Sequence, residues 1–281
     1  MIQLEMMQSL GNAFPPRLTE VPEPGPDGQD QMGFFTDTSL CIGCKACEVA
    51  CKQWNGLPAD GFEWTGRSYD NTTRLGATTW RHVSFTEQAM PSGDVRWHFN
   101  SDVCKHCATA PCQEACPTGA IIRNEFDSVY VQQDICNGCG YCIPACPFGV
   151  LARSEHDGAA HKCTLCYDRQ KDGITPACAK ACPTESIMFG NLSDLRARAD
   201  KRVEELHARG QTSAYLYGDR PSGEYSALNA FFLLTEEPAT YNLPPAPRRP
   251  AARMVQRYLF SAAVAVAGTI AGAVLLGRED S

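Results

Sequence analysis

Sixteen cysteines constrain the fold of this 281-residue chain more than any other feature. All of them lie between Cys41 and Cys182, in four groups of four. The groups are Cys41-x2-Cys44-x2-Cys47-x3-Cys51, Cys104-x2-Cys107-x4-Cys112-x3-Cys116, Cys136-x2-Cys139-x2-Cys142-x3-Cys146 and Cys163-x2-Cys166-x11-Cys178-x3-Cys182. A proline follows the last cysteine of the second, third and fourth groups. Cysteines this close together predict that the chain folds around metal centres.

Two other uses of cysteine fit the pattern less well. Disulfide-stapled secreted domains are usually short, whereas this chain is long, and cysteines two residues apart are better placed to wrap a metal than to bridge distant loops. A tetrahedral zinc site also uses Cys-x2-Cys pairs. It needs neither a third cysteine two residues further on nor a Cys-Pro ending repeated three times.

The spacing suits 4Fe–4S clusters. A cubane needs four thiolates at its corners, and a loop with two residues between cysteines can curl round one cluster and supply three of them. The fourth cysteine, followed by proline, then points to the other cluster of a pair, as in bacterial ferredoxins. Sixteen thiolates at four per cubane predict four 4Fe–4S clusters, with iron bound through all sixteen cysteines.

The spacing leaves the pairing of the groups open. Cys116 and Cys136 are separated by 19 residues, enough for a ferredoxin-like hairpin that links the second and third groups. The first and fourth groups would then pair with each other. The alternative pairs the first group with the second and the third with the fourth.

The expected fold class is α+β, with two bacterial-ferredoxin-like two-cluster modules and one C-terminal transmembrane helix. Residues 1–33 are rich in proline and glycine, lack the apolar run of a signal peptide, and predict an extended tail. Residues 34–190 carry the four-cluster region, in which the cysteine-free insertion 55–100 is expected to form short strands and loops. Residues 191–247 are expected to hold a helix, a strand and a linker.

The helix is predicted over residues 193–209, where Leu195, Val203 and Leu206 fall on one face. Ser193 is the expected N-cap, and Gly210 ends the helix. Residues 231–234 are expected to form a strand, and the proline-rich residues 243–247 a stiff linker.

Residues 248–281 are expected to form a membrane anchor. The segment from Tyr258 to Gly277 contains no charged residue, and a helix of 20 residues spans about 30 Å, the thickness of the bilayer core. A buried core helix is the alternative, which the position after a proline linker disfavours. Four arginines precede the segment and one follows it, so the count of basic residues puts the globular part in the cytoplasm. The net charge of −7 argues against a nucleic-acid partner.

Residues 41–51 and 134–149 carry a resemblance to a known family. From about residue 34 to 245 the sequence resembles the iron–sulfur (beta) subunits of membrane-linked molybdopterin oxidoreductases, most closely those of formate dehydrogenases. Relatives from nitrate reductases replace one cysteine with tryptophan and carry a three-iron cluster. Every cysteine is present here, which argues against that branch.

The resemblance implies that the second and third groups are nested inside the first and fourth. The implied ligand sets are cluster A with Cys41, Cys44, Cys47 and Cys182; cluster B with Cys51, Cys163, Cys166 and Cys178; cluster C with Cys104, Cys107, Cys112 and Cys146; and cluster D with Cys116, Cys136, Cys139 and Cys142. It also implies a wire that takes electrons from a molybdenum or tungsten site on a large catalytic subunit. The electrons pass to a further acceptor, such as a membrane cytochrome or a quinone-reactive subunit. Many members of the family lie outside the cytoplasm, which conflicts with the orientation that the arginines predict.

The sequence shows no nucleotide signature, phosphate loop or nucleophile elbow, so the expected role is non-catalytic. Lys45, Lys105, Lys162 and Arg153 lie near the cysteine groups, either to favour the reduced clusters or as solvated and interface charges. His106 and His161 flank cysteines but are not expected to be ligands, because sixteen cysteines already fill sixteen positions. The same wire in another reductase or hydrogenase, a free polyferredoxin and a redox sensor are the alternatives. The predicted anchor weighs against a diffusing carrier.

Overall fold

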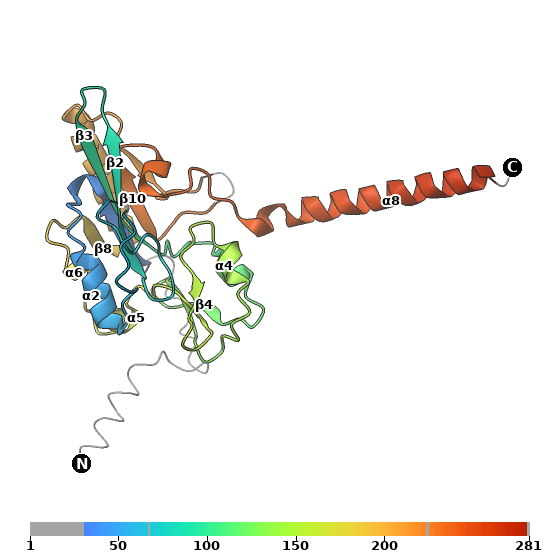
Figure 1. Ribbon diagram of the computed structural model, residues 1–281, viewed down its shortest axis with the longest axis horizontal. Coiled ribbons are helices and arrows are strands. Elements are labelled where there is room, and N and C mark those ends of the chain that lie inside the picture. Colours follow the sequence, from blue (N-terminus) through green and yellow to red (C-terminus); the bar gives the residue numbers. More distant parts are fainter. Residues whose placement is uncertain (1–30, 67, 223–224, 280–281) are drawn as a thin grey trace, which may run out of the picture.

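The computed structural model describes residues 31–66, 68–222 and 225–279, and only the backbone of residues 252–257 and 271–279. The predicted tail, residues 1–33, lies almost wholly outside these ranges. The cysteine-bearing part forms one body, and the C-terminal helix α8 extends away from it (Figure 1).

A four-stranded sheet contains the strands that flank the cysteine region in the sequence. Its strand order is β8-β1-β10-β9, with bounds β8 Ile187–Asn191, β1 Met32–Asp37, β10 Ala230–Leu234 and β9 Tyr215–Tyr217. β1 precedes the first cysteine group and β8 follows the fourth, and the two strands pair antiparallel, with Phe34 opposite Phe189. The sheet therefore brings the first and fourth groups together, although more than a hundred residues separate them.

β10 confirms the strand predicted over residues 231–234 and lies at the centre of the core. All five of its residues are buried, as the continuous apolar run suggests for a strand covered on both faces. Phe232 and Leu234 face the cluster region, while Phe231 and Leu233 face helix α7. β10 pairs parallel with β1, whose Phe35 stacks on Phe231 at a centroid distance of 5.3 Å.

Helix α7 (Leu192–Ala208) confirms the predicted helix but not its predicted cap. Leu195 and Leu206 are buried and Val203 is partly buried against the sheet, as the periodicity indicated. The N-cap is Asn191, whose side chain accepts the backbone N–H of Ser193. The prediction of Ser193 is wrong because β8 runs directly into the helix, so the first helical turn begins earlier.

The insertion contains long strands rather than the short ones expected. β2 (Arg81–Ala89) and β3 (Val95–Val103) pair antiparallel over nine residues each. The hairpin packs at its middle against the first cysteine group, where Gly43 lies against Phe85 and Phe99. Gly43 has a φ of +67°, so both its backbone and its surroundings exclude a side chain.

Short elements surround the cysteines. They are η1 (Thr38–Leu40), α2 (Ala46–Asn55), α3 (Pro111–Glu114), α4 (Cys142–Ala145), α5 (Tyr167–Lys171) and α6 (Ala177–Lys180), with the ribbons β4 (Ile121–Arg123) to β5 (Val129–Val131) and β6 (Ala152–Arg153) to β7 (Ala160–His161). β4 and β5 form the hairpin expected between Cys116 and Cys136. Helix α2 packs against α6, which again joins the first group to the fourth.

The C-terminal part comprises two 3-10 turns, η2 (Pro238–Tyr241) and η3 (Pro250–Arg253), and α8 (Met254–Glu279). Just before η3, Arg249 forms a two-pronged ion pair with Glu114 of α3, with Nε 3.0 Å from Oε2. Over the part of the sequence that the structure describes, no helix combines the length and the apolar character needed to cross a membrane. The side chains of residues 271–277, the end of the predicted anchor, lie outside the described residues.

Candidate metal centres

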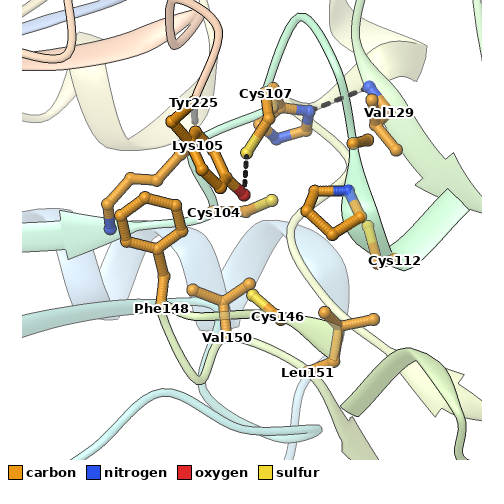
Figure 2. Close-up of a pocket in the computed structure, with 13 residues that line it drawn as sticks. Cys104, Lys105, Cys107, Cys112, Val129, Cys146, Phe148, Val150, Leu151 and Tyr225 are labelled. Atoms are coloured by element: carbon orange, nitrogen blue, oxygen red, sulfur yellow. Dashed lines mark hydrogen bonds between the residues drawn. The ribbon is translucent and has the colours of Figure 1, made fainter. Parts of the chain in front are cut away.

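Four cysteines from two groups surround one cavity in the inner part of the molecule. Its cysteines are the predicted set of cluster C: Cys104, Cys107, Cys112 and Cys146. Figure 2 shows their sulfurs turned toward the same space. Three of the four cysteines are buried, so this cavity has little contact with solvent.

Four other cysteines surround a second cavity. They are the predicted set of cluster A: Cys41, Cys44, Cys47 and Cys182. Ser101 of β3 and Ile187 of β8 also line this cavity, so the hairpin and the sheet both help to form its wall. Each of the two cavities mixes cysteines from two groups, and this mixing fits the nested pairing rather than the adjacent one.

The remaining eight cysteines also fall into two neighbourhoods, because the cysteines of each neighbourhood shift one another's pKa values. Burial raises the pKa of the Cys166 thiol to about 12, and the charge of Cys178 contributes to this shift. Burial likewise raises the pKa of Cys163, with contributions from Cys51, Cys166 and Cys178, and also from Cys104 of the adjacent C set. Cys51, Cys163, Cys166 and Cys178 are the predicted set of cluster B.

The same effects group the cysteines of the predicted cluster D. Burial raises the pKa of the Cys142 thiol to about 11, and charges at Cys136, Cys116 and Cys139 contribute to the shift. Cys139 is exposed, so this neighbourhood reaches the surface.

The donor chemistry suits iron–sulfur clusters. All sixteen cysteines are free thiols within the described residues. Burial raises the pKa of both Cys47 and Cys107 to about 12, so a bound cation is needed to hold them as thiolates near neutral pH. Among the described residues, no three Cys, His, Asp or Glu side chains converge as ligands of one metal ion. The thiols surround open volumes instead.

Two buried lysines lie beside these cavities. Lys105 Nζ donates to Val103 O at 2.7 Å and pairs with Asp102, while Lys162 Nζ donates to Cys163 O at 2.9 Å and also to Val129 O. Both side chains are buried, which excludes the solvated alternative for them. Burial alone would lower the pKa of Lys162, but the neighbouring thiolates of the B and C sets outweigh it and raise that pKa.

The other two predicted cations lie differently. Lys45 forms partly buried ion pairs with Asp70 at 3.2 Å and Glu48 at 3.4 Å. Arg153 is exposed and lies against Gly138 and Gly140, in the loop of the third cysteine group.

Arg81 is a buried cation that the sequence did not suggest. Its Nη2 lies 3.4 Å from Cys178 Sγ, and its Nη1 donates to Ser101 O at 3.0 Å. The guanidinium also lies over the Phe34 ring, 4.8 Å from its centroid. Charges at Cys178 and Cys47 raise the pKa of Arg81 despite its burial, which places it between the B and A sets.

Hydroxyl groups approach four cysteine sulfurs: two in set A, one in set C and one in set D. Ser101 Oγ is 3.2 Å from Cys47 Sγ, and Tyr225 OH is 3.5 Å from Cys107 Sγ (Figure 2). The hydroxyls of Thr118 and Thr184 approach Cys116 and Cys182 at 3.5 and 3.8 Å. The repeated Cys-Pro-Thr sequence could have indicated the two threonines, whereas Ser101 and Tyr225 come from distant segments and carry no such signal.

The two histidines differ sharply in their surroundings. His161 Nε2 lies 2.8 Å from Asp157 near the surface. His106 is fully buried, lines the cavity of the C set, and accepts the Val129 N–H on Nδ1 at 3.1 Å. Burial, together with the charges of Lys162 and Arg123, lowers the pKa of His106 well below its usual range.

Comparison with known proteins agrees with this geometry. Two family profiles, each described as a 4Fe-4S dicluster domain, match residues 95–192 and 40–120. The iron-sulfur subunit of Haemophilus influenzae formate dehydrogenase is 38% identical over 198 residues, which are 69% of this chain and 63% of the relative. The beta subunit of Megalodesulfovibrio gigas formate dehydrogenase is 32% identical over 223 residues, 75% of this chain and 96% of the relative. A subunit of the Escherichia coli anaerobic dimethyl sulfoxide reductase is 34% identical over 173 residues, 60% of this chain and 77% of the relative.

The fold and the cysteine sites define an electron-transfer iron–sulfur protein with two dicluster, ferredoxin-like domains. The matched region spans slightly under two thirds of the Haemophilus influenzae relative. This protein belongs to the family of iron–sulfur beta subunits of formate dehydrogenases and related molybdopterin enzymes.

Proposed function

We propose that this protein is the electron-conducting subunit of a formate dehydrogenase. It carries electrons from a molybdopterin catalytic subunit, with molybdenum or tungsten, to a membrane cytochrome or quinone-reactive subunit. The relatives named above that are formate dehydrogenase subunits support the substrate, and the cysteine sets support the conducting role. The cysteines of sets A to D would hold the four clusters, which would supply one-electron carriers.

The observation that carries the proposal is the distribution of exposed cysteines. Cys44 of set A and Cys139 of set D are exposed, while all four cysteines of set B and three of set C are buried. Buried cations lie between neighbouring sets, Arg81 between A and B and Lys162 between B and C. In the order A–B–C–D, the two end sets therefore reach the protein surface, and the two middle sets are shielded from solvent.

The residues of this protein perform three tasks in the mechanism. The cysteines fix the positions of the clusters, and the apolar core around them excludes water. Fixed charges and hydroxyl donors at the sulfurs set the reduction potentials, which in such clusters follow charge, hydrogen bonding and exposure. None of these tasks requires a residue to transfer a proton.

The test is anaerobic purification of the native complex, followed by iron and sulfide analysis and EPR of the reduced protein. We expect sixteen irons in each copy of the protein, one for each cysteine, and reduction of the clusters by formate. Zinc, or far fewer irons, would overturn the cluster assignment. A co-purifying large subunit that ignores formate would favour the second candidate, the same role in a reductase, which the likeness to the dimethyl sulfoxide reductase subunit supports.

We also propose that α8 anchors the protein in a membrane, with the cluster domain on the cytoplasmic side. The uncharged run 258–277 supports this, as do exposed apolar side chains such as Leu259, Phe260 and Ile270 on α8. A protein truncated after residue 247 and expressed outside its native complex should no longer be found in the membrane fraction. Digestion of the cluster domain by protease added outside intact cells would overturn the cytoplasmic orientation.

A further inference from the structure

His106 occupies a strained and fully buried position beside the cavity of set C. Its φ is +42°, in the left-handed region that residues other than glycine seldom adopt. The second intervening residue of the first Cys-x2-Cys loop has a positive φ in all four groups, at Gly43, Gly138 and Leu165 as well, so the loop around each site holds the backbone in this form. The residue lies in the second cysteine group, between Cys104 and Cys107, and lines the cavity that these cysteines share with Cys112 and Cys146.

A backbone hydrogen bond fixes the protonated nitrogen of the His106 ring. The Val129 N–H points at Nδ1 at 3.1 Å, and the dashed line at Val129 in Figure 2 marks this bond. A backbone N–H can only donate, so Nδ1 must be the acceptor and the ring proton must sit on Nε2. The orientation therefore turns Nε2 into a hydrogen-bond donor.

This donor has no partner within the described residues. His106 Nε2 is buried from solvent and makes no hydrogen bond to any described protein group. Buried donors without an acceptor are rare in native proteins and call for an explanation, such as an acceptor that belongs to a bound group. The cavity beside it is lined by four thiols, so a bound cluster would bring sulfur acceptors to this position.

We propose that the Nε2–H of His106 donates a hydrogen bond to a sulfur of cluster C and raises the reduction potential of that cluster. The proposal rests on the proposed function, because it needs a cluster in this cavity. His106 is a positioning residue and not a ligand. An electron added to a bound cluster would increase the negative charge on its sulfurs and so would strengthen this bond, while the proton would stay on Nε2.

The test compares His106→Phe with His161→Phe in the anaerobic complex. Both changes remove an imidazole within two residues of a cluster cysteine, but His161 is bonded to Asp157 and lies near the surface. Iron and sulfide analysis must first show four clusters in each protein, which tests the proposed function separately. EPR-monitored redox titration then measures the four potentials.

We expect His106→Phe to lower only the potential of cluster C. The ratio of reduced to oxidised cluster at a fixed potential should fall about tenfold, which is about 59 mV for a one-electron couple. His161→Phe should leave that ratio unchanged. Four intact clusters with unchanged potentials in His106→Phe would overturn the proposal.

A second measurement uses the wild-type complex and so does not depend on the folding of a His106 variant. In the wild-type complex labelled with ¹⁵N-histidine, pulsed EPR of reduced cluster C should detect a weak coupling to one histidine nitrogen. The coupling should persist in His161→Phe. Its absence from a wild-type complex that holds all four clusters would also overturn the proposal.

Discussion

Replacement of Arg81 tests whether a buried charge sets the potentials of two clusters. We predict that Arg81→Gln lowers the reduction potentials of clusters A and B. The guanidinium lies 3.4 Å from Cys178 Sγ and is coupled electrostatically to Cys47, so its positive charge favours the more negative, reduced clusters. Glutamine keeps an amide donor at this site but removes the charge.

The distance between Arg81 and Cys178 gives the size of the effect. At 3.4 Å, and with an effective dielectric constant of about 20, two unit charges attract by about 5 kcal/mol. The added electron is shared over a whole cluster and not held on one sulfur, so we take about half of this value. About 2.5 kcal/mol corresponds to about 100 mV for a one-electron couple. Cluster B, which Cys178 would ligate, should shift more than cluster A.

EPR-monitored redox titration of the anaerobic complex measures this shift. Arg81→Lys keeps the charge and loses the planar fork, so its potentials should remain closer to those of the wild type. Arg220→Gln is the control, because Arg220 is 70% exposed and pairs with Asp200 at the surface. Equal shifts in Arg81→Gln and Arg81→Lys, or none in Arg81→Gln, would refute the reasoning.

Three further predictions concern helix α7 and cluster D. Leu195→Ala should lower the free energy of opening of α7 by about 3 kcal/mol, because it leaves a cavity in place of a buried side chain. Hydrogen exchange of the α7 amides measures this free energy, and unchanged protection would contradict the prediction. Asn191→Ala should lower the same free energy by about 1 kcal/mol and Ser193→Ala by less, and the reverse order would show that Ser193 is the cap after all. Thr118→Val should lower the potential of cluster D by on the order of 40 mV, the one-electron equivalent of about 1 kcal/mol, in the same titration as above. An unchanged potential would mean that the hydroxyl does not bond the sulfur.

The elements that the sequence predicts best are those whose patterns lie within a short stretch of residues. The apolar run of β10 and the helical periodicity of Leu195, Val203 and Leu206 predict structure without knowledge of their partners. The cysteine spacing works in the same way, because a short loop must place its thiols around one centre. Such local patterns predicted the kind of site and the helix and strand that border it.

Contacts between distant segments account for what the sequence did not show. The nine-residue strands of the hairpin mix exposed and buried polar residues, so alternation did not indicate their length. Arg81 and Cys178 are 97 residues apart, and a single arginine in a polar segment is usually exposed. Tyr225 reaches Cys107 across 118 residues. Only the folded protein shows that these side chains meet at the sulfurs.

The buried charges offer an independent argument that the cavities hold anionic groups. Arg81 and Lys162 are almost completely buried, and neither forms an ion pair with a carboxylate among the described residues. A buried charge without a counter-ion is strongly destabilising. The anionic groups within reach are the cysteine sulfurs, at Cys178 for Arg81 and at Cys104, Cys112 and Cys163 for Lys162. Neutral thiols could not compensate these cations, whereas thiolates bound to iron could. Loss of the clusters should therefore lower the stability of the protein, and the same two cations lie where they would favour the entry of electrons.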